Sequence, residues 1–214
     1  MKIILRFLLL VFCAAFLYSC SNSTSVGLSG NVTDLFPLKI GNTWTYLIKD
    51  YDTTGKVASQ GSDIWTVTSK VDTMGNAVYF FSTQNGPSAL YYHGDKLFVF
   101  GNYGLPLLQY PVSRGAVLIR RDTIYAYPSD TTVSKSYTTF LGDNVVLDLG
   151  FEKFFCSKFE FMSIGGPVSH PDSSNASTLY FAAKKGLVKE ADYDFYNKVR
   201  YLRRTYELQS YKVN

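Results

Sequence analysis

The chain has 214 residues, of which 46% are hydrophobic and 16% aromatic, and a formal net charge of +4. Lys2 and Arg6 supply two of the excess positive charges, and the remainder of the chain is close to balanced. This balance gives no basic surface of the kind that nucleic acid requires, so we expect no nucleic-acid partner.

The first twenty residues have the three-part layout of a bacterial export signal. Lys2 and Arg6 precede an apolar run from Phe7 to Leu17, and Leu17-Tyr18-Ser19 lead into Cys20. An apolar run of about eleven residues reaches only about half of a roughly 30 Å hydrocarbon core, which argues against a retained transmembrane helix. A soluble secreted form, cut at another site, remains an alternative.

Residues 17–20, Leu-Tyr-Ser-Cys, resemble the lipobox of secreted lipoproteins, whose cysteine is lipidated and becomes the new N-terminus. The resemblance implies two or three fatty acyl chains, palmitate among them, on Cys20, and more than one chain makes anchoring stable. It also implies the outer membrane as the destination, because Ser21 rather than Asp follows the cysteine. We therefore expect a signal peptide over 1–19 and a protein anchored in the cell envelope.

Small polar residues follow Cys20 and show no apolar periodicity, so residues 20–33 are predicted to be a flexible tether. The remaining residues, 34–214, form one domain of alternating strands and turns. Predicted strands and turns are Trp44 to Ile48, the turn Asp52–Gly55, Ile64–Ser69, the turn at 74–76, Val78–Phe81, the hairpin of Leu90–Tyr92 and Leu97–Phe100 around His93–Lys96, Val117–Ile119, Ile124–Tyr127, Thr132–Phe140, Phe154–Met162, Leu179–Ala183, Leu187–Glu190 and Val199–Tyr211.

The predicted fold class is all-β, with a single antiparallel sheet. So many strands need a strongly curved sheet, a half-barrel or a closed barrel, because a flat sheet leaves long edges exposed. The sequence does not choose between these. The segment Glu190–Lys198 is also compatible with a short helix.

Cysteine use excludes a disulfide in the mature protein. Cys13 leaves with the signal and Cys20 carries lipid, which leaves Cys156 alone. We expect Cys156 to be a small packed side chain rather than a reactive thiol. Simple strand alternation, however, places Cys156 on one face with Lys158 and Glu160, opposite Phe155, Phe159 and Phe161.

The sequence contains no catalytic or metal-binding motif. His93 and His170 fall in predicted turns and are expected to be surface residues. Asp143, Asp148, Glu152 and Glu160 are scattered, and glycoside cleavage needs two carboxylates at a set separation. We expect no enzyme activity, no metal and no cofactor.

Four Asp-Thr triplets begin at Asp52, Asp72, Asp122 and Asp130. Asp and Thr side chains cap tight turns, which is the simpler explanation. Each triplet also resembles the Asp-Ser/Thr acceptor pattern for O-glycosylation of exported proteins in one group of Gram-negative bacteria. The resemblance makes Thr53, Thr73, Thr123 and Thr131 candidate glycosylation sites.

Residues 179–214 carry eight Lys or Arg against four Asp or Glu, namely Glu190, Asp192, Asp194 and Glu207. Such an end could touch anionic lipid or polysaccharide. Because the signs are interleaved, a solvated strand face is the preferred interpretation.

The segment Phe36-Pro-Leu-Lys-Ile-Gly-Asn-Thr-Trp-Thr-Tyr46 resembles the opening strand, FPLxxGNxWxY, of a group of uncharacterised lipoproteins secreted into Gram-negative envelopes. Tyr180–Lys189 and Glu207–Lys212 are similar to the late hairpin and closing strand of that group. The resemblance implies a fold and an envelope address, and it transfers no catalytic residue.

Three functions fit this sequence, and a non-catalytic structural or interaction module at the membrane is favoured. The second is a carrier whose curved sheet holds an apolar or glycolipid ligand, because aromatic side chains serve a ligand as well as a core. The third and least favoured is an envelope hydrolase. An apolar cavity would favour the carrier, and converging carboxylates would favour the hydrolase.

Overall fold

The computed structural model describes residues 30–73, 75–84, 86–100, 106–124, 132–165, 172–196 and 199–214. The described part is one short helix followed by strands. The predicted signal peptide and Cys20 lie outside it. The elements are α2 (Val32–Leu35), β1 (Thr43–Tyr51), β2 (Val57–Thr73), β3 (Asn76–Ser82), β4 (Ser88–His93), β5 (Lys96–Val99), β6 (Pro106–Gln109), β7 (Val117–Ile124), β8 (Thr132–Asp148), β9 (Lys153–Gly165), β10 (Asp172–Ala182), β11 (Gly186–Tyr196) and β12 (Val199–Lys212).

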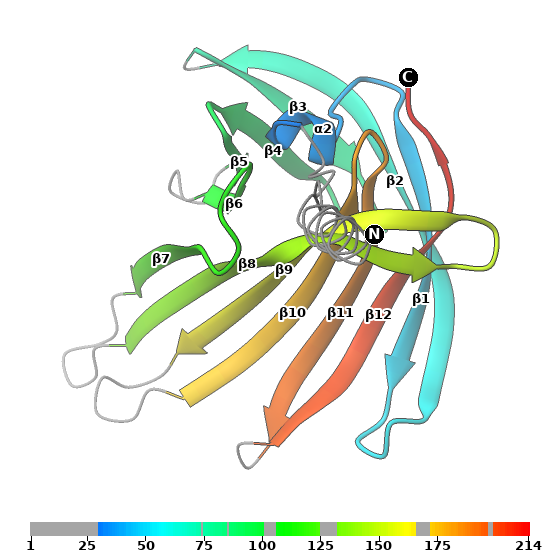
Figure 1. Ribbon diagram of the computed structural model, residues 1–214, viewed down its shortest axis with the longest axis vertical. Coiled ribbons are helices and arrows are strands. Elements are labelled where there is room, and N and C mark those ends of the chain that lie inside the picture. The colour runs from blue at the N-terminus through cyan, green and yellow to red at the C-terminus, as the bar shows by residue number, and fades with distance from the viewer. Residues whose placement is uncertain are drawn as a thin grey trace, which may run out of the picture.

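The strands form one twelve-stranded antiparallel sheet that curls into a nearly closed barrel (Figure 1). The spatial order is β6-β5-β4-β3-β2-β1-β12-β11-β10-β9-β8-β7. All pairs of adjacent strands but one are consecutive in the sequence. The exception is the pair β1–β12, in which Thr43 faces Lys212. The predicted all-β class with a strongly curved single sheet is confirmed.

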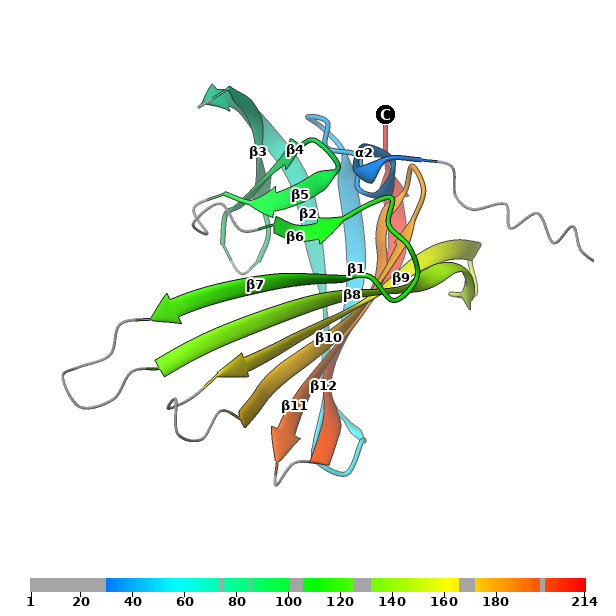
Figure 2. The same ribbon diagram turned by 60° about the vertical axis from the view of Figure 1, so that its left-hand side comes forward.

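The two edge strands, β6 and β7, approach each other without forming a ladder, and Figure 2 shows them at the front of the barrel. A side chain of β8 crosses this seam, because the Thr138 hydroxyl donates a hydrogen bond to the Leu107 carbonyl of β6 at 2.9 Å. The barrel is therefore held together at the seam by side chains rather than by backbone pairing.

Local turn chemistry explains the best-predicted strands. Asp52 follows β1 and accepts hydrogen bonds from the Thr54 and Lys56 amides at 2.8 and 3.0 Å, which fixes the β1–β2 turn. Gly55 in this turn has a φ of +82°, a conformation that L side chains rarely adopt. The predicted turns at Asp52–Gly55 and His93–Lys96 both connect hairpins, β1–β2 and β4–β5.

The packed domain begins earlier than the predicted boundary at residue 34. Asn31 caps α2, accepting from the Thr33 and Asp34 amides, and the Asp34 carboxylate accepts from the Asn31 amide in return. Val32, which falls in the predicted tether, is fully buried. Residues 30–33 thus belong to the folded domain.

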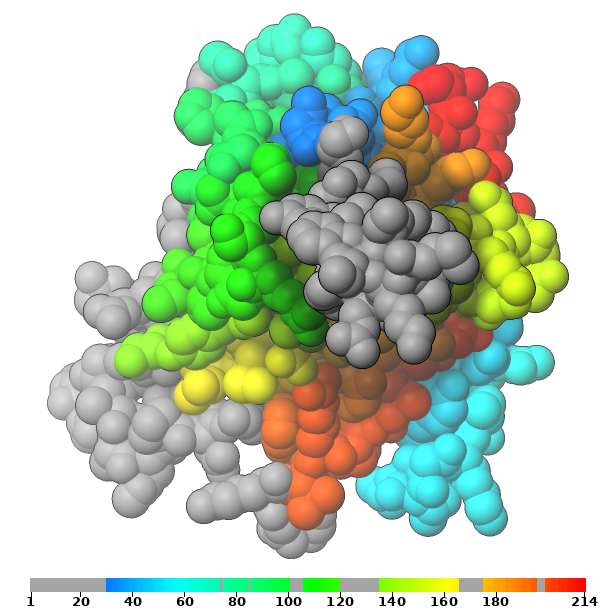
Figure 3. All heavy atoms as spheres, viewed as in Figure 1, coloured from blue at the N-terminus to red at the C-terminus, as the bar shows by residue number. Residues whose placement is uncertain are grey.

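The α2 segment covers one end of the barrel, next to the β10–β11 turn. Figure 3 shows its blue atoms between the green strands and the orange hairpin tip. The Phe36 ring stacks on Trp44 at 5.2 Å between centroids and meets Phe181 edge-on at 6.1 Å. Gly186 has a φ of +98°, and a Cβ there would lie 2.9 Å from Trp44 Nε1. Only glycine lets this turn approach the aromatic cluster.

Two sequence-based placements differ from the structure. Cys156 and Phe159 are buried, whereas Phe155 is 60% exposed, the reverse of the simple alternation for Phe155. The β8–β9 register shifts on either side of Gly142 place the extra residues in β8, whereas β9 pairs with β10 without a shift from Cys156 to Ser163. Cys156 and Phe159 are therefore both buried although they lie on opposite faces of β9. The optional helix at Glu190–Lys198 is also absent, because β11 continues as a strand to Tyr196.

Candidate functional site

An apolar cavity of about 260 Å³ lies inside the barrel. Strands from both halves of the sheet contribute its wall, together with Phe36, which follows α2 at the covered end of the barrel. Most of the lining is hydrophobic, and the polar exceptions are Ser177 and Glu190. The lining residues are Phe36, Trp65, Leu90, Leu97, Leu107, Phe161, Ser177, Leu179, Phe181, Leu187 and Glu190.

Among the residues that the structure describes, Glu190 is the one ionisable side chain that lines this cavity. It lies opposite Leu179 of β10 and Tyr206 of β12. The side chain is partly accessible at the cavity wall but lies deep among protein atoms. Burial, followed by the charge of Asp192 and a hydrogen bond with it, raises the pKa of Glu190 to about 8. Glu190 is therefore mostly a neutral carboxylic acid at pH 7.

Asp192 lies one step along the same face of β11 and is held by its own partners. The Ser177 hydroxyl donates to Asp192 Oδ1 at 2.6 Å, and Arg203 lies 3.7 Å from Asp192 Oδ2. Arg203 also lies 3.7 Å from Asp194 Oδ2, so this single cation is shared by two carboxylates. Among the described residues, no Lys, Arg or His lies within ion-pair distance of Glu190.

Three aromatic rings pack together at the same end of the cavity. The Tyr46 and Trp65 ring centroids are 4.9 Å apart, and Tyr206 lies 6.5 and 6.3 Å from them. Buried Asp63 fixes Trp65 by accepting from its Nε1 at 2.9 Å, and it also accepts from the Gln84 amide. Burial, with the charges of Glu190 and Asp63, raises the pKa of Tyr46. The cavity thus has an apolar body and an acidic, aromatic end.

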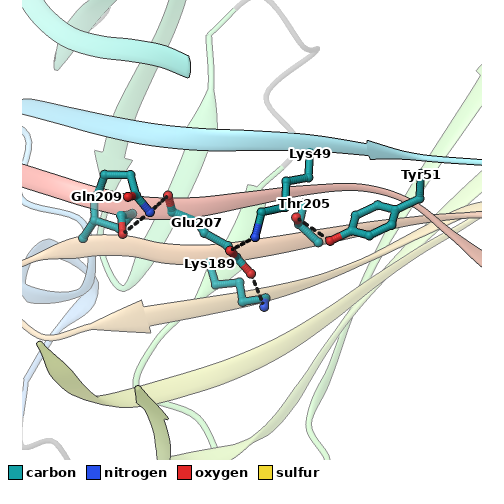
Figure 4. Close-up of polar contacts among 7 residues, drawn as sticks. Lys49, Tyr51, Lys189, Thr205, Glu207 and Gln209 are labelled. Atoms are coloured by element: carbon teal, nitrogen blue, oxygen red, sulfur yellow. Dashed lines mark hydrogen bonds and ion pairs between the residues drawn. The ribbon is translucent and has the colours of Figure 1, made fainter. Parts of the chain in front are cut away.

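The outer surface of the same strands has a different chemistry (Figure 4). Glu207 accepts from Lys189 at 2.7 Å and from Lys49 at 2.9 Å, which makes a ladder across β11, β12 and β1. Burial alone would raise the pKa of Glu207, but these two lysines together lower it. The prediction of a solvated face with interleaved charges is wrong for Glu190, which faces the cavity.

The residues proposed from sequence for chemistry do not meet in one place. His93 is exposed at the end of β4 and contacts Asn76 at 3.1 Å, and His170 lies outside the described residues. The four candidate carboxylates each have a separate partner, namely Tyr110 for Asp143, Lys153 for Asp148, Tyr211 for Glu152 and Arg200 for Glu160. Within the described part of the chain, no group of three or more His, Cys, Asp or Glu could hold a metal ion.

The modification candidates are distributed over distant hairpins. Thr53 is exposed in the β1–β2 turn, and Thr73 is half-buried at the end of β2. Thr123 belongs to β7, while Thr131 and Cys20 lie outside the described residues. At Asp52 the turn-capping chemistry is present, and it leaves Thr53 free to project outward. Glycosylation of these threonines stays a prediction.

Cys156 is fully buried in the core, as expected for a packed side chain. Burial raises the pKa of its thiol to about 12, so the thiolate is scarce at neutral pH.

Sequence reasoning missed Glu190, Asp192 and Ser177. Glu190 and Asp192 alternate with Ala191, which gives a two-residue period, but the period does not say which face is inward. Tyr180 pairs with Lys189 and Phe181 with Leu187, so Val188 is an extra residue that forms a bulge. Because of this bulge, the inward face of Glu190 cannot be predicted by counting in steps of two from the apolar residues Leu187 and Val188.

The fold and site define an antiparallel β-barrel domain with an interior apolar cavity. No family model and no curated protein matches the chain. Two solved structures are similar to it. An exported protein of Bacteroides fragilis with a YmcC-like fold is 13% identical, with a TM-score of 0.44. A lipoprotein of Parabacteroides distasonis is 15% identical, with a TM-score of 0.40. Each match covers 83% of this chain and 98% of the other.

Proposed function

We propose that this protein is a non-catalytic binding protein of the cell envelope, anchored in the outer membrane by lipid on Cys20, which carries a small apolar ligand inside its barrel. The observation that carries the proposal is the interior cavity of about 260 Å³ with its largely hydrophobic wall. Ligand sites are typically concave, mostly apolar and equipped with a few polar groups. The sequence favoured a structural or interaction module, and the cavity is the feature that shifts the balance to a carrier.

The cavity volume restricts the ligand. An engineered cavity of about 150 Å³ holds benzene, and drug-sized ligands occupy roughly 300–1,000 Å³. The cavity here lies between these sizes, so the ligand is larger than benzene, and a complete glycolipid does not fit.

The anchor is proposed from the export signal and lipobox alone. In the part of the chain that is described, no helix is long and apolar enough to cross a membrane. A non-catalytic role is proposed because the scattered carboxylates are each bound to a different partner, and because the Ser177 hydroxyl donates to the Asp192 carboxylate and not to the histidine of a catalytic triad.

Native mass spectrometry of protein purified from its own membrane tests both parts of the proposal. We expect a polypeptide that starts at Cys20 and carries covalent acyl mass, together with a non-covalently bound small molecule. The same spectrum resolves any glycan mass on threonine. The Cys20→Ser variant should lose the acyl mass and leave the membrane fraction. The Leu90→Trp variant fills the cavity and should lose the small molecule.

Ile64→Trp is the matched control for Leu90→Trp, because Ile64 is 53% exposed and does not line the cavity. It should keep the bound molecule. If the wild-type barrel carries no small molecule and takes up no apolar compound of suitable size, the binding function is wrong. If the protein is acyl-free in its own membrane, the anchor is wrong.

A further inference from the structure

At the acidic end of the cavity, Glu190 makes no ion pair with the described cations, and the charge of Arg203, which is bound to Asp192, only partly offsets the burial of its carboxyl group. Asp192 and Asp194 share Arg203, and Asp50 is paired with Arg204. Glu190 faces the cavity, and among the described side chains its polar partner is Asp192, another acid. Ionising Glu190 beside Asp192 in this interior is costly, and a cationic group placed next to Glu190 would stabilise the ionised form.

The aromatic rings at this end point to the same kind of ligand. Trp65 lines the cavity together with Glu190, and Tyr46 and Tyr206 pack around Trp65. The faces of Trp and Tyr attract cations within about 6 Å of the ring centroid, and quaternary ammonium groups are recognised in this way. A neutral apolar ligand would gain only contact area from the same rings.

We propose that the ligand is a small organic cation, an amine or quaternary ammonium with an apolar body, whose charge lies between Glu190 and Trp65. The apolar body would occupy the space among Leu90, Leu97 and Leu107. This inference rests on the proposed binding function and adds the chemical class of the ligand.

Proton balance gives the proposal a distinctive signature. In the empty barrel Glu190 holds its proton at pH 7, because burial and Asp192 raise its pKa to about 8. A cation beside Glu190 favours the ionised form, so binding releases one proton to solvent and the carboxylate then pairs with the cation. Affinity should rise by up to tenfold per pH unit as the pH approaches 8 and should level off above it.

The groups around Glu190 come from five strands, and the released proton must be assigned to Glu190 rather than to one of them. They are Asp192 on β11, Ser177 on β10, Arg203 and Tyr206 on β12, and, through Tyr46, the neighbours Asp63 and Trp65. Burial raises the pKa of Tyr46 and of Tyr206 above 10, so neither phenol titrates near pH 8.

Binding of phenyltrimethylammonium and of its uncharged isostere tert-butylbenzene tests the inference, with calorimetry as the readout. Both have about ten non-hydrogen atoms, a size intermediate between benzene and a drug-sized ligand. We expect the cation to bind the wild type at least tenfold more tightly than the isostere. Glu190→Gln should remove this preference, so that the cation and the isostere bind with similar affinity. Glu207→Gln, on the outer surface, should change neither.

Calorimetry in two buffers of different ionisation enthalpy measures the released proton on the wild type, so the test does not depend on the folding of Glu190→Gln. Proton release with the cation and none with the isostere supports the proposal. Equal affinities, or a preference that survives Glu190→Gln, overturns the ligand class and leaves the binding function standing. Failure of both compounds to bind, together with an empty barrel in native mass spectrometry, overturns the binding function itself.

Discussion

Replacement of Glu190 by Gln should change how the stability of the barrel depends on pH. The raised pKa of Glu190 means that the folded protein keeps a proton which the unfolded chain loses above about pH 4.5. The unfolded state therefore binds fewer protons than the folded state between pH 4.5 and about 8, and the free energy of unfolding falls as the pH rises through this window. Gln carries no such proton, so the variant lacks this contribution.

The magnitude follows from one proton per molecule. The slope is at most about 1.4 kcal/mol per pH unit, so the wild type should lose up to about 4 kcal/mol between pH 5 and pH 8 through this group. Such a loss is a large part of a typical stability of about 5–15 kcal/mol. At pH 5 the Gln variant should be within about 1 kcal/mol of the wild type, since the Gln amide can donate to Asp192 as the protonated acid does.

Urea unfolding followed by far-UV circular dichroism at half-unit steps from pH 5 to pH 8 measures this difference. The variant should become steadily more stable than the wild type as the pH rises. Two parallel curves, with a constant offset at every pH, would refute the assignment of Glu190 as a buried neutral acid.

Glu207→Gln is the control with the opposite electrostatics. The pKa of Glu207 is lowered by Lys189 and Lys49 in spite of burial, so its stabilising contribution is present above pH 4.5 and is lost as the pH falls through the folded pKa. Between pH 5 and pH 8 its offset from the wild type should be constant. It should be about 1 kcal/mol or less, because these lysine side chains are about a quarter exposed.

Three further predictions concern the frame of the barrel. Gly186→Ala should lower the free energy of unfolding by about 2 kcal/mol or more in urea titrations, because φ is +98° and the new methyl group would collide with Trp44; an unchanged midpoint would contradict the tight turn. Cys156 should resist a thiol reagent such as DTNB in the native protein and react at once in guanidinium, because burial raises its pKa to about 12; rapid native labelling would show that it is accessible. Thr138→Val should cost about 1 kcal/mol and speed amide hydrogen exchange in β6, because it removes the hydrogen bond to Leu107 across the seam; unchanged exchange would mean that the seam is closed by other contacts.

The sequence predicts those parts of the fold that depend on residues close to one another in the chain. Asp52 and Gly55 define a turn by their own chemistry, and Trp44 and Tyr46 alternate into the core within one strand. The short helix α2 also has a local signal, the capping pair of Asn31 and Asp34, although a four-residue helix has no apolar period to reveal it.

The candidate site could not be predicted, because it depends on where bulges fall. The bulge at Val188 decides which side of β11 faces inward, and it arises from pairing with β10 rather than from the residues of β11 alone. The pairing of Glu190 with Tyr206 requires β12 to lie beside β11. Trp65 comes near Glu190 only because β1 and then β2 lie next to β12 in the sheet. Charge alternation alone is equally compatible with a solvated surface.

The strand order has a consequence for how the protein acquires its shape. The middle of the sheet is the pair β1–β12, formed by the first and the last strands, while the edges β6 and β7 come from the middle of the chain. Two meanders of six strands can form early from local hairpins, but each keeps one long unpaired edge until residues 199–212 have been made or translocated. The two meanders therefore join only when β12 has formed, and the loss of β12 would remove the centre of the sheet rather than trim its margin.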